Sequence, residues 1–451
     1  MRKADQPKDP GTDPANRKAN APENIVLPGD KEISLRHQSG HRMQFSPKRS
    51  ANHLTRLQQT VCQAEGSLAG QFAQIQLAAA AGNFDDAKTR LASLYHEYVD
   101  ECDRNEFLYR NLVQSNVALG QFSCACRLIN RHLDCSDTWG FCIDPDSTRP
   151  PNTVLWTVRS RAQYCFEFSS NLYLIPHTEM VLNNWLSSLP ALMAYRNYDD
   201  HKCGQVVVNL GDHGVLPGLA FSDCRIDSFL IPDPQFQSTH AYREIGDSFD
   251  RNDIAWLDRR PLAFWRGATT GRYPVAGVQN WLDLPRVRLC TIANSRPDLF
   301  DVGLHRIIQI QKEEDILAIE HSGLMRPPVP ETDFNQYRYQ IDIDGNSNSW
   351  AGLFIKLLTG SPVLKISSPM GFRQWYYDLL KPWVHFVPVA ADMSDLIEKT
   401  EWLRDNPGRA EDIGNRGRSL ARTLSYESEI ERCSSTLASA FQFFSTGTAR
   451  R

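Results

Sequence analysis

The sequence predicts an α/β protein in which two consecutive α/β units follow a helical N-terminal segment. Short apolar runs alternate with helical patterns from about residue 150 onward, and several of these runs end in small polar turns. Residues 53–133, by contrast, show helical patterns throughout. Strands that alternate with helices form parallel sheets, and such sheets bind ligands at the carboxyl ends of their strands.

Length and composition bound the class of protein. The chain has 451 residues, of which 41% are hydrophobic and 10% aromatic, which suits a globular protein of two or three domains. A formal net charge of −4 gives no general attraction to nucleic acid. No apolar run is long enough to span a bilayer, and the first residues show no signal-like region. The 11 cysteines form no CxxC pair, so we expect reduced thiols and a cytoplasmic protein.

The N-terminal third divides into two regions. Residues 1–50 are rich in Pro, Asp, Lys and Arg, so we expect a disordered, mildly basic tail. This tail could touch an anionic membrane surface, although a solvated tail without a partner is the simpler expectation. Residues 51–140 are interpreted as a helical hairpin extension, because the turn at 81–87 recurs at 119–125 as in tetratricopeptide-like hairpins. Such a layer would pack on the main body or bind a partner.

The first α/β unit is expected at residues 141–258. Its clearest strand is 205–210, an apolar run that ends in Gly211, Asp212, His213 and Gly214. Further apolar runs predict strands at 154–158, 219–222 and 229–232, and a helix at 177–195. Asp212 would therefore lie at the carboxyl end of a buried strand, where a parallel sheet presents side chains to a ligand.

The second α/β unit is expected at residues 259–425, with a C-terminal helix at 426–451. A strand at 262–267 runs into the turn at 268–271, and a helix opens at Pro285. The remaining predicted elements are strand 337–343, helix 350–358, strand 363–366, helix 372–380, strand 384–389, and helices 394–403 and 408–424.

The loop at 344–349 is the strongest candidate for chemistry in this unit. It joins an alternating strand to an amphipathic helix, and its residues are small and polar. The first amides of a helix have no intrahelical partner, and with the helix dipole they favour an anion such as a diphosphate. Equally, Asn348 or Ser349 could simply cap the helix. The loop contains neither GxGxxG nor GxxxxGK[ST], so both interpretations stay open.

Four stretches together resemble glycosyltransferase family 90 over about residues 200–425: FWRGATTGR, PRVRLC, DGNSNSWAGLFIKLLTGSPVLK and WYYDLLKPWVHFVPV. That family includes protein O-glucosyl- and O-xylosyltransferases, fungal capsule-associated xylosyltransferases and bacterial lipopolysaccharide-modifying enzymes. The bacterial branch is nearest, because DGNSNSWAGLF replaces an arginine-bearing version of the loop. The resemblance implies a GT-B fold, in which two Rossmann-like domains face each other across a cleft. It also implies sugar transfer with inversion and without a metal ion, from a nucleotide sugar on the C-terminal domain.

The resemblance assigns roles to particular residues. The catalytic base of the family is an aspartate in an N-x-x-D context, which falls here on Asp212, and His213 could assist it. A carboxylate there would take the proton of the acceptor hydroxyl. An arginine at the start of the helix that opens at Pro285 would neutralise charge on the departing diphosphate. The implied UDP-sugar contacts are Gly267, Ala268, Arg286, Arg288, Asn346, Ser347, Asn348, Ser349, Trp350 and Ala351.

Two departures from the family pattern bear on the donor site. Ala351 stands where the animal enzymes carry an arginine, and Lys356 and Lys365 are candidates to meet the diphosphate charge, although lysines are usually on the surface. Asp342 and Asp344 spell DxD, a metal motif in the GT-A class of glycosyltransferases. Within a GT-B unit the same residues are a strand end, so we expect no metal and no cofactor besides the donor.

The sequence thus predicts an inverting glycosyltransferase that moves a glucose- or xylose-type sugar from a UDP-sugar to a glycan hydroxyl. The expected acceptor is lipopolysaccharide core or another surface polysaccharide, met in the cytoplasm or at the cytoplasmic face of a membrane with which the protein associates peripherally. No nucleic-acid partner is expected. Three alternatives remain: transfer to a protein Ser or Thr, a metal-dependent transferase, and a non-catalytic binding or scaffold protein that uses its helical repeats.

Overall fold

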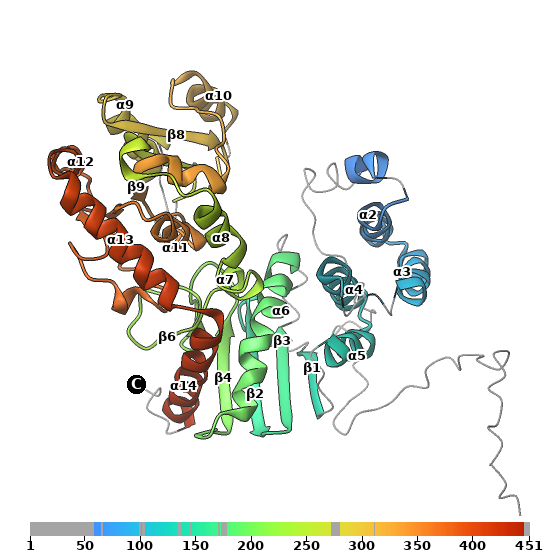
Figure 1. Cartoon of the computed structure of the whole chain (residues 1–451). Helices are drawn as coiled ribbons and strands as arrows, with labels where there is room; N and C mark the ends of the chain where they lie inside the picture. Colours follow the sequence, from blue (N-terminus) through green and yellow to red (C-terminus); the bar gives the residue numbers. More distant parts are fainter. Residues whose placement is uncertain are drawn as a thin grey trace, which may run out of the picture. The chain divides into compact units, whose positions relative to one another are not determined.

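The computed structural model describes residues 58–445 except for 65, 99–100, 102–103, 133–137, 145–146, 170–171, 173–177, 272–279 and 311. The predicted tail at 1–50 lies outside these residues. All described residues belong to one compact unit, Phe45–Arg451. They form a mixed α/β fold with two separate sheets and many helices (Figure 1). None of the described helices is long and apolar enough to cross a membrane.

Two helical hairpins precede the first sheet, as the repeat predicts. Their helices are α2 (Leu68–Ala80), α3 (Phe84–Tyr98), α4 (Glu106–Ala118) and α5 (Phe122–His132). Gly82 and Gly120 turn the chain within the two hairpins at φ +81° and +71°, a left-handed conformation that glycine adopts without a Cβ penalty. Arg110 on α4 donates to Ser187 Oγ at 2.9 Å, and α4 and α6 are in contact. The hairpin layer therefore packs on the main body.

The first sheet has six strands in the order β1-β3-β2-β4-β5-β6. They are β1 (Thr138–Asp144), β2 (Thr153–Ser160), β3 (Gln163–Ser169), β4 (Gly204–Asn209), β5 (Leu219–Ala220) and β6 (Phe229–Leu230). The prediction of a parallel sheet is wrong for part of it, because β2 pairs antiparallel with both β3 and β4. A two-residue turn at Arg161 and Ala162 joins β2 directly to β3, and only antiparallel strands can be joined so tightly. The sequence patterns missed β1 and β3.

The second sheet is entirely parallel, as predicted, in the order β11-β10-β9-β7-β8. Its strands are β7 (Arg260–Ala268), β8 (Phe300–Arg306), β9 (Tyr337–Asp342), β10 (Val363–Ile366) and β11 (Val387–Val389). Its helices are α9 (Pro285–Asn294), α10 (Glu313–His321), α11 (Ala351–Leu358), α12 (Leu396–Asp405) and α13 (Pro407–Thr423). Because the strands are parallel, all their carboxyl ends lie on one edge of the sheet.

Shorter helices and 3-10 turns lie between the main strands and helices of both units. They are α7 (Pro234–Ser238), α8 (Arg243–Arg251), and the 3-10 turns η3 (Tyr195–Asn197), η4 (Trp256–Asp258), η5 (Trp281–Asp283), η6 (Glu331–Gln336) and η7 (Tyr377–Leu379). The helix predicted at 372–380 is wrong: only η7 forms there. Arg373 instead pairs with Asp223 in an isolated antiparallel bridge, which requires extended backbone. Trp375 and Tyr376 are then buried against Phe236 and Phe354, respectively.

The last helix returns the chain to the first sheet. Helix α6 (Thr178–Ala194) and α14 (Tyr426–Ser445) pack against each other, and α14 also contacts β4 (Figure 1). The ring of Phe441 on α14 lies 5.0 Å from that of Trp156 on β2, within the first hydrophobic core. Trp350, which precedes α11 near the second sheet, packs against the same core and lies 6.2 Å from Phe221. The loops that follow β4 and β9 are thereby brought together.

Candidate active site

The loop after β4 is held in shape by Asn209, the asparagine of the N-x-x-D pattern. Its side chain is fully buried, and its Nδ2 donates to the carbonyls of Leu216 and Leu219, both at 2.9 Å. Its Oδ1 accepts from the amides of Val215 and Leu216 at 2.9 and 3.0 Å. These four bonds fold the following turn back onto the sheet, so that Asp212 stands half-buried at the strand end.

The loop after β9 contacts Asp212 directly. Asn346 Nδ2 donates to the Asp212 carboxylate, with 3.0 Å between Nδ2 and Oδ2, and Ser347 Oγ donates to the Asp212 carbonyl at 2.7 Å. Asn346 Oδ1 also accepts from the amide of Gly271 at 3.4 Å. The structure therefore brings together three of the residues predicted for the site, from loops that are more than 130 residues apart in the chain.

The start of α11 is capped by the loop itself. Asn348 Oδ1 accepts from the amide of Trp350 at 2.7 Å, and Ser349 Oγ accepts from the amide of Leu353 at 3.1 Å. Trp350 takes φ +52°, so the helix begins one residue later than predicted. Two backbone amides that were candidates to bind a diphosphate, those of Trp350 and Leu353, are thus already hydrogen-bonded to side chains of the loop. Asn348 Nδ2, in contrast, is buried and has no hydrogen-bond partner among the described residues.

Arg286 ties the ends of β7 and β9 together beneath this loop. Its Nε donates to the Asp344 carbonyl at 2.9 Å, and its Nη2 donates to the Ile343 carbonyl at 3.3 Å. Its Nη1 donates to Thr270 Oγ1 at 2.6 Å and to the Ala268 carbonyl at 3.3 Å. A guanidinium has five N–H donors, so these four bonds leave one of them to a ligand. Burial lowers the pKa of Arg286 to about 10, which leaves it charged at neutral pH.

Three predicted contact residues lie elsewhere. Gly267 is in β7, where a Cβ would come within 2.3 Å of the Trp265 ring, so this glycine serves packing. Arg288 is exposed on α9. The pKa of Asp392 is lowered mainly by its hydrogen bond from Ser394, and the charge of Arg288 adds to this effect. Ala351 is buried as the first residue of α11.

Asp342 forms a buried ionic cluster with the two lysines behind the loop. Its Oδ1 lies 2.9 Å from Lys356 Nζ and its Oδ2 lies 3.2 Å from Lys365 Nζ. Burial alone would raise the pKa of Asp342, but the two ammonium groups outweigh it and hold the pKa well below the usual range. Lys356 and Lys365 are therefore not surface lysines. Both oxygens of Asp342 are engaged, which leaves it poorly suited to bind a cation.

A pocket of about 140 Å³ lies at the carboxyl edge of the second sheet. The loop and strand ends form part of its wall: Gly271, Ile343, Asp344, Gly345, Asn346 and Ser347. The segment after β10 forms another part: Ile366, Ser367, Pro369, Met370 and Phe372. Burial raises the pKa of Asp344 to about 6. The sequence analysis did not identify Phe372 as a site residue, because its segment was predicted as a helix. It placed Gly271 in a turn without assigning it to the site.

His213, beside Asp212, is half-buried and lies next to Phe372, a residue of the pocket wall. Its ring lies 5.7 Å from that of Phe372. Burial lowers the pKa of His213, so the imidazole is neutral at neutral pH.

Comparisons with known proteins agree with the resemblance noted in the sequence. Residues 244–430 match the sequence model of the family described as Glycosyl transferase family 90. This part of the chain is therefore similar to members of that family. Arg286, Asn346 and Ser347 lie within the matched region, whereas Asp212 precedes it.

Similar proteins come from animals and viruses. Human "Protein O-glucosyltransferase 3" is 28% identical over 276 residues, which cover 59% of this chain and 48% of the relative. Rat "Protein O-glucosyltransferase 1" is 32% identical over 165 residues, or 36% of each chain. "Uncharacterized protein 027R" of Frog virus 3 is 33% identical over 202 residues, which cover 41% of this chain and 20% of the relative. The chain thus spans less than half the length of these curated relatives.

One solved structure, "Crystal structure of GtfA/B complex", aligns with 40% of this chain and 36% of its own at 16% identity. Its TM-score of 0.27 is too low for the likeness to bear on the fold.

Proposed function

We propose that this protein is a metal-independent, inverting glycosyltransferase that uses a UDP-sugar, with its two sheets arranged as the two domains of a GT-B enzyme. The observation that carries the proposal is the 3.0 Å contact between Asn346 Nδ2 and Asp212 Oδ2 beside the pocket. A general base must lie within hydrogen-bond range of the acceptor hydroxyl while that hydroxyl faces the donor sugar. The contact supports such a site, because it joins a carboxylate to the rim of an enclosed pocket.

In the proposed reaction, Asp212 accepts the proton of the acceptor hydroxyl as its oxygen attacks the anomeric carbon of the donor. The new carbon–oxygen bond forms on the face opposite UDP, while the bond between the anomeric carbon and the diphosphate oxygen breaks. UDP leaves with the electron pair, and the product has the opposite anomeric configuration. Asn346 would hold the Asp212 carboxylate in position until the acceptor hydroxyl replaces it as a hydrogen-bond donor.

Positive charge behind the pocket supports a diphosphate ligand. Lys356 and Lys365 bring two charges against the single charge of Asp342, and Arg286 adds a third, fixed by four hydrogen bonds. Asp344 in the pocket wall is largely ionised at neutral pH and offsets one of these, so that one positive charge remains in excess. The unused N–H of Arg286 and the unpartnered Nδ2 of Asn348 are donors that phosphate oxygens could satisfy. We propose that these groups together replace the family arginine at Ala351.

Two acceptor classes have support. The sequence resembles the lipopolysaccharide-modifying branch, so our first candidate is a surface glycan met in the cytoplasm or at a membrane surface. The second candidate is a protein Ser or Thr hydroxyl, because human and rat relatives carry the name protein O-glucosyltransferase. The alternative of a non-catalytic scaffold predicts that no donor is consumed.

The test is incubation of the full chain with UDP-glucose or UDP-xylose, in EDTA, with neutral oligosaccharides and with Ser- and Thr-containing peptides. We expect donor-dependent release of UDP and a β-linked product, which proton NMR identifies by its anomeric coupling. A product that retains the α configuration, or activity that EDTA abolishes, would contradict the mechanism. Donors left intact with every acceptor would favour the scaffold alternative.

A further inference from the structure

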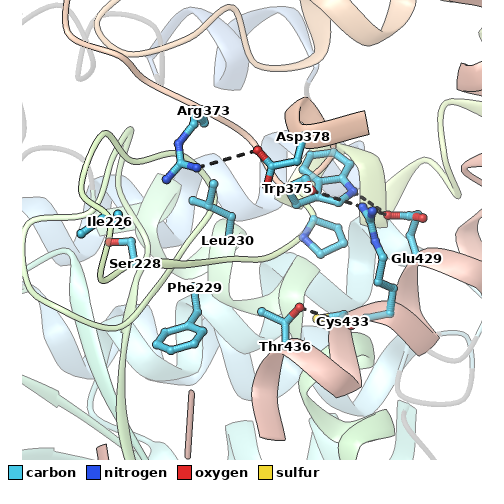
Figure 2. Close-up of a pocket in the computed structure, with 12 residues that line it drawn as sticks. Ile226, Ser228, Phe229, Leu230, Arg373, Trp375, Asp378, Glu429, Cys433 and Thr436 are labelled. Carbon is cyan, nitrogen blue, oxygen red and sulfur yellow. Dashed lines mark hydrogen bonds and ion pairs between the residues drawn. The ribbon is translucent and has the colours of Figure 1, made fainter. Parts of the chain in front are cut away.

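A second, larger pocket lies between the edge of the first sheet, the segment at 373–378 and α14. Its volume is about 340 Å³ (Figure 2). In the view of Figure 2, Ile226 and Ser228 lie on the left of the pocket, and Glu429 lies on the right. Six side chains bring polar groups to the lining: Ser228, Arg373, Asp378, Glu429, Arg432 and Thr436. The site described above uses none of them.

The charged groups of this second pocket are balanced. Arg373 Nη1 lies 3.8 Å from Asp378 Oδ1, and Arg432 pairs with Glu429. Glu429 is almost fully buried and also accepts from Trp375 Nε1 at 2.9 Å, so its position is fixed from two directions. Two positive and two negative groups give no net attraction for an anion or a cation. A phosphate-bearing ligand would meet two carboxylates as well as two arginines.

Hydroxyl-rich ligands match such a lining. Arginine side chains only donate hydrogen bonds and carboxylates only accept them, whereas each hydroxyl does both. A neutral sugar can therefore satisfy both kinds of group without disrupting the ion pairs. Ile226 and Leu230 add apolar surface, against which the C–H face of a sugar ring can pack. Ile226 is 98% exposed, so it stands at the open side of the pocket.

Continuous structure links this pocket to the candidate active site. The segment 369–378 lines both pockets: Met370 and Phe372 face the first, and Arg373 and Trp375 face the second. Between them, the ring of Phe372 lies 5.7 Å from His213, the neighbour of Asp212. The backbone of Arg373 also pairs with Asp223 in both directions, at 2.9 and 3.2 Å.

The loop of the candidate base rests on the same aspartate. Asp223 accepts a hydrogen bond from Ser228 of the second pocket. A Cβ on Gly214 would come within 2.0 Å of Asp223 Oδ2, so these two residues pack together. Gly214 is two residues from Asp212. The second pocket is therefore connected to the base loop through Asp223, and the 369–378 segment separates it from the donor pocket.

We propose that the pocket between β6, residues 373–378 and α14 binds an uncharged sugar unit of the acceptor, some distance from the hydroxyl that reacts. This inference rests on the proposed function, because it places the donor in the first pocket and the reacting hydroxyl at Asp212. It favours a glycan acceptor of at least two sugar units over a protein Ser or Thr, since a peptide hydroxyl alone would leave the pocket unused.

The test uses a substitution that fills the pocket and a matched control on the same helix. Thr436 and Ser439 are both on α14, and each hydroxyl donates to the carbonyl four residues earlier. Thr436 lines the pocket, whereas Ser439 is exposed outside it. Thr436→Phe therefore fills the pocket, and Ser439→Phe adds the same ring elsewhere. The probes are an array of neutral oligosaccharides, matched oligosaccharides that carry phosphate or carboxylate groups, and Ser- and Thr-containing peptides.

We expect the parent to bind neutral oligosaccharides, and Thr436→Phe to weaken that binding at least about tenfold, the scale of a lost pocket contact. Ser439→Phe should bind like the parent, and UDP should stabilise all three proteins equally in a thermal melt. Binding of neutral oligosaccharides that Thr436→Phe leaves unchanged would overturn the inference, as would preference for anionic probes or peptides, or no binding at all. If UDP does not raise the melting temperature of the parent, the proposed function itself would be overturned.

Discussion

The loops after β4 and β9 both follow buried strands, yet they hold their acidic residues in opposite ways. The β4 loop is fixed by the neutral side chain of Asn209, and its single carboxylate, Asp212, faces the other loop. The β9 loop follows a strand whose end carries Asp342 between two buried lysines and, two residues later, Asp344 in the pocket wall. The β4 loop presents a carboxylate that can act as a base, and the β9 loop lies over a cluster of buried charged side chains.

This difference indicates a division of labour between the two sheets. A base needs a carboxylate oxygen that can accept from the acceptor hydroxyl, and Asp212 in the β4 loop offers one. A diphosphate site needs positive charge held by the fold, which Arg286, Lys356 and Lys365 provide behind the β9 loop. Substitutions on the two sides should therefore fail in different ways, and four of them test this comparison.

The largest effect should follow Asp342→Asn. Two buried lysines would lose their common partner, and breaking a buried ion pair by removing one member costs about 3–5 kcal/mol. Chemical denaturation should report this loss of unfolding free energy. Combining Asp342→Asn with Lys356→Met should recover part of it, because one unpaired charge is then removed. A loss below about 1 kcal/mol for the single variant would mean that the cluster does not support the loop.

On the other side of the comparison, Asp212→Asn should leave the fold intact and lower turnover at least about a hundredfold, the scale for loss of a general base. The amide replaces a carboxylate whose oxygen accepts from Asn346, so the local shape is kept. Steady-state kinetics and a UDP titration measure the two quantities separately. Near-normal turnover in the purified variant would remove Asp212 from the role of base.

Arg286→Ala should weaken UDP binding and slow transfer together. Hydrogen bonds to a charged group contribute about 1.5–3 kcal/mol, so we expect a loss of roughly tenfold or more in UDP affinity. Arg286→Lys should restore it only in part, because an ammonium cannot reproduce the guanidinium fork. Arg288→Ala is the matched control on the same helix, where the side chain is exposed. Equal effects of the two alanine variants would contradict the assignment.

The smallest effect should distinguish Asp344 from Asp342. The folded pKa of Asp344 is raised to about 6, above its unfolded value, so the folded state retains the proton longer. Stability is therefore lost as pH rises from about 4 to about 6. Asp344→Asn should unfold like the parent near pH 4 and be more stable at pH 7.5 by about 1–2 kcal/mol, allowing for partial exposure. Equal stabilities at pH 7.5 would indicate an ordinary pKa.

The sequence predicted four of the five strands of the second sheet, because parallel strands that are buried on both faces read as apolar runs between helical patterns, but it missed the edge strand β8. It singled out the loops of Asp212 and of Asn346 and Ser347, but it did not predict that they touch, since no local pattern joins loops so far apart in the chain. The partners of Lys356 and Lys365 could not be predicted, because a lone lysine in a sequence carries no sign of burial. The helix predicted at 372–380 is absent because tertiary burial of Trp375 and Tyr376 overrides the local helical preference of this segment.

The central claim is that the two loops form one site, with UDP bound on the side of the second sheet. Thermal melts with and without UDP test it on the parent, Asp212→Asn and Asn346→Asp. Asn346→Asp brings a second carboxylate beside the Asp212 carboxylate and the pocket, where like charges would oppose a diphosphate.

Asn111→Asp on α4 is the control for the added charge. We predict that UDP stabilises the parent, Asp212→Asn and Asn111→Asp alike, through mass action, and does not stabilise Asn346→Asp. A full UDP-dependent shift in Asn346→Asp, or none in the parent, would contradict the account.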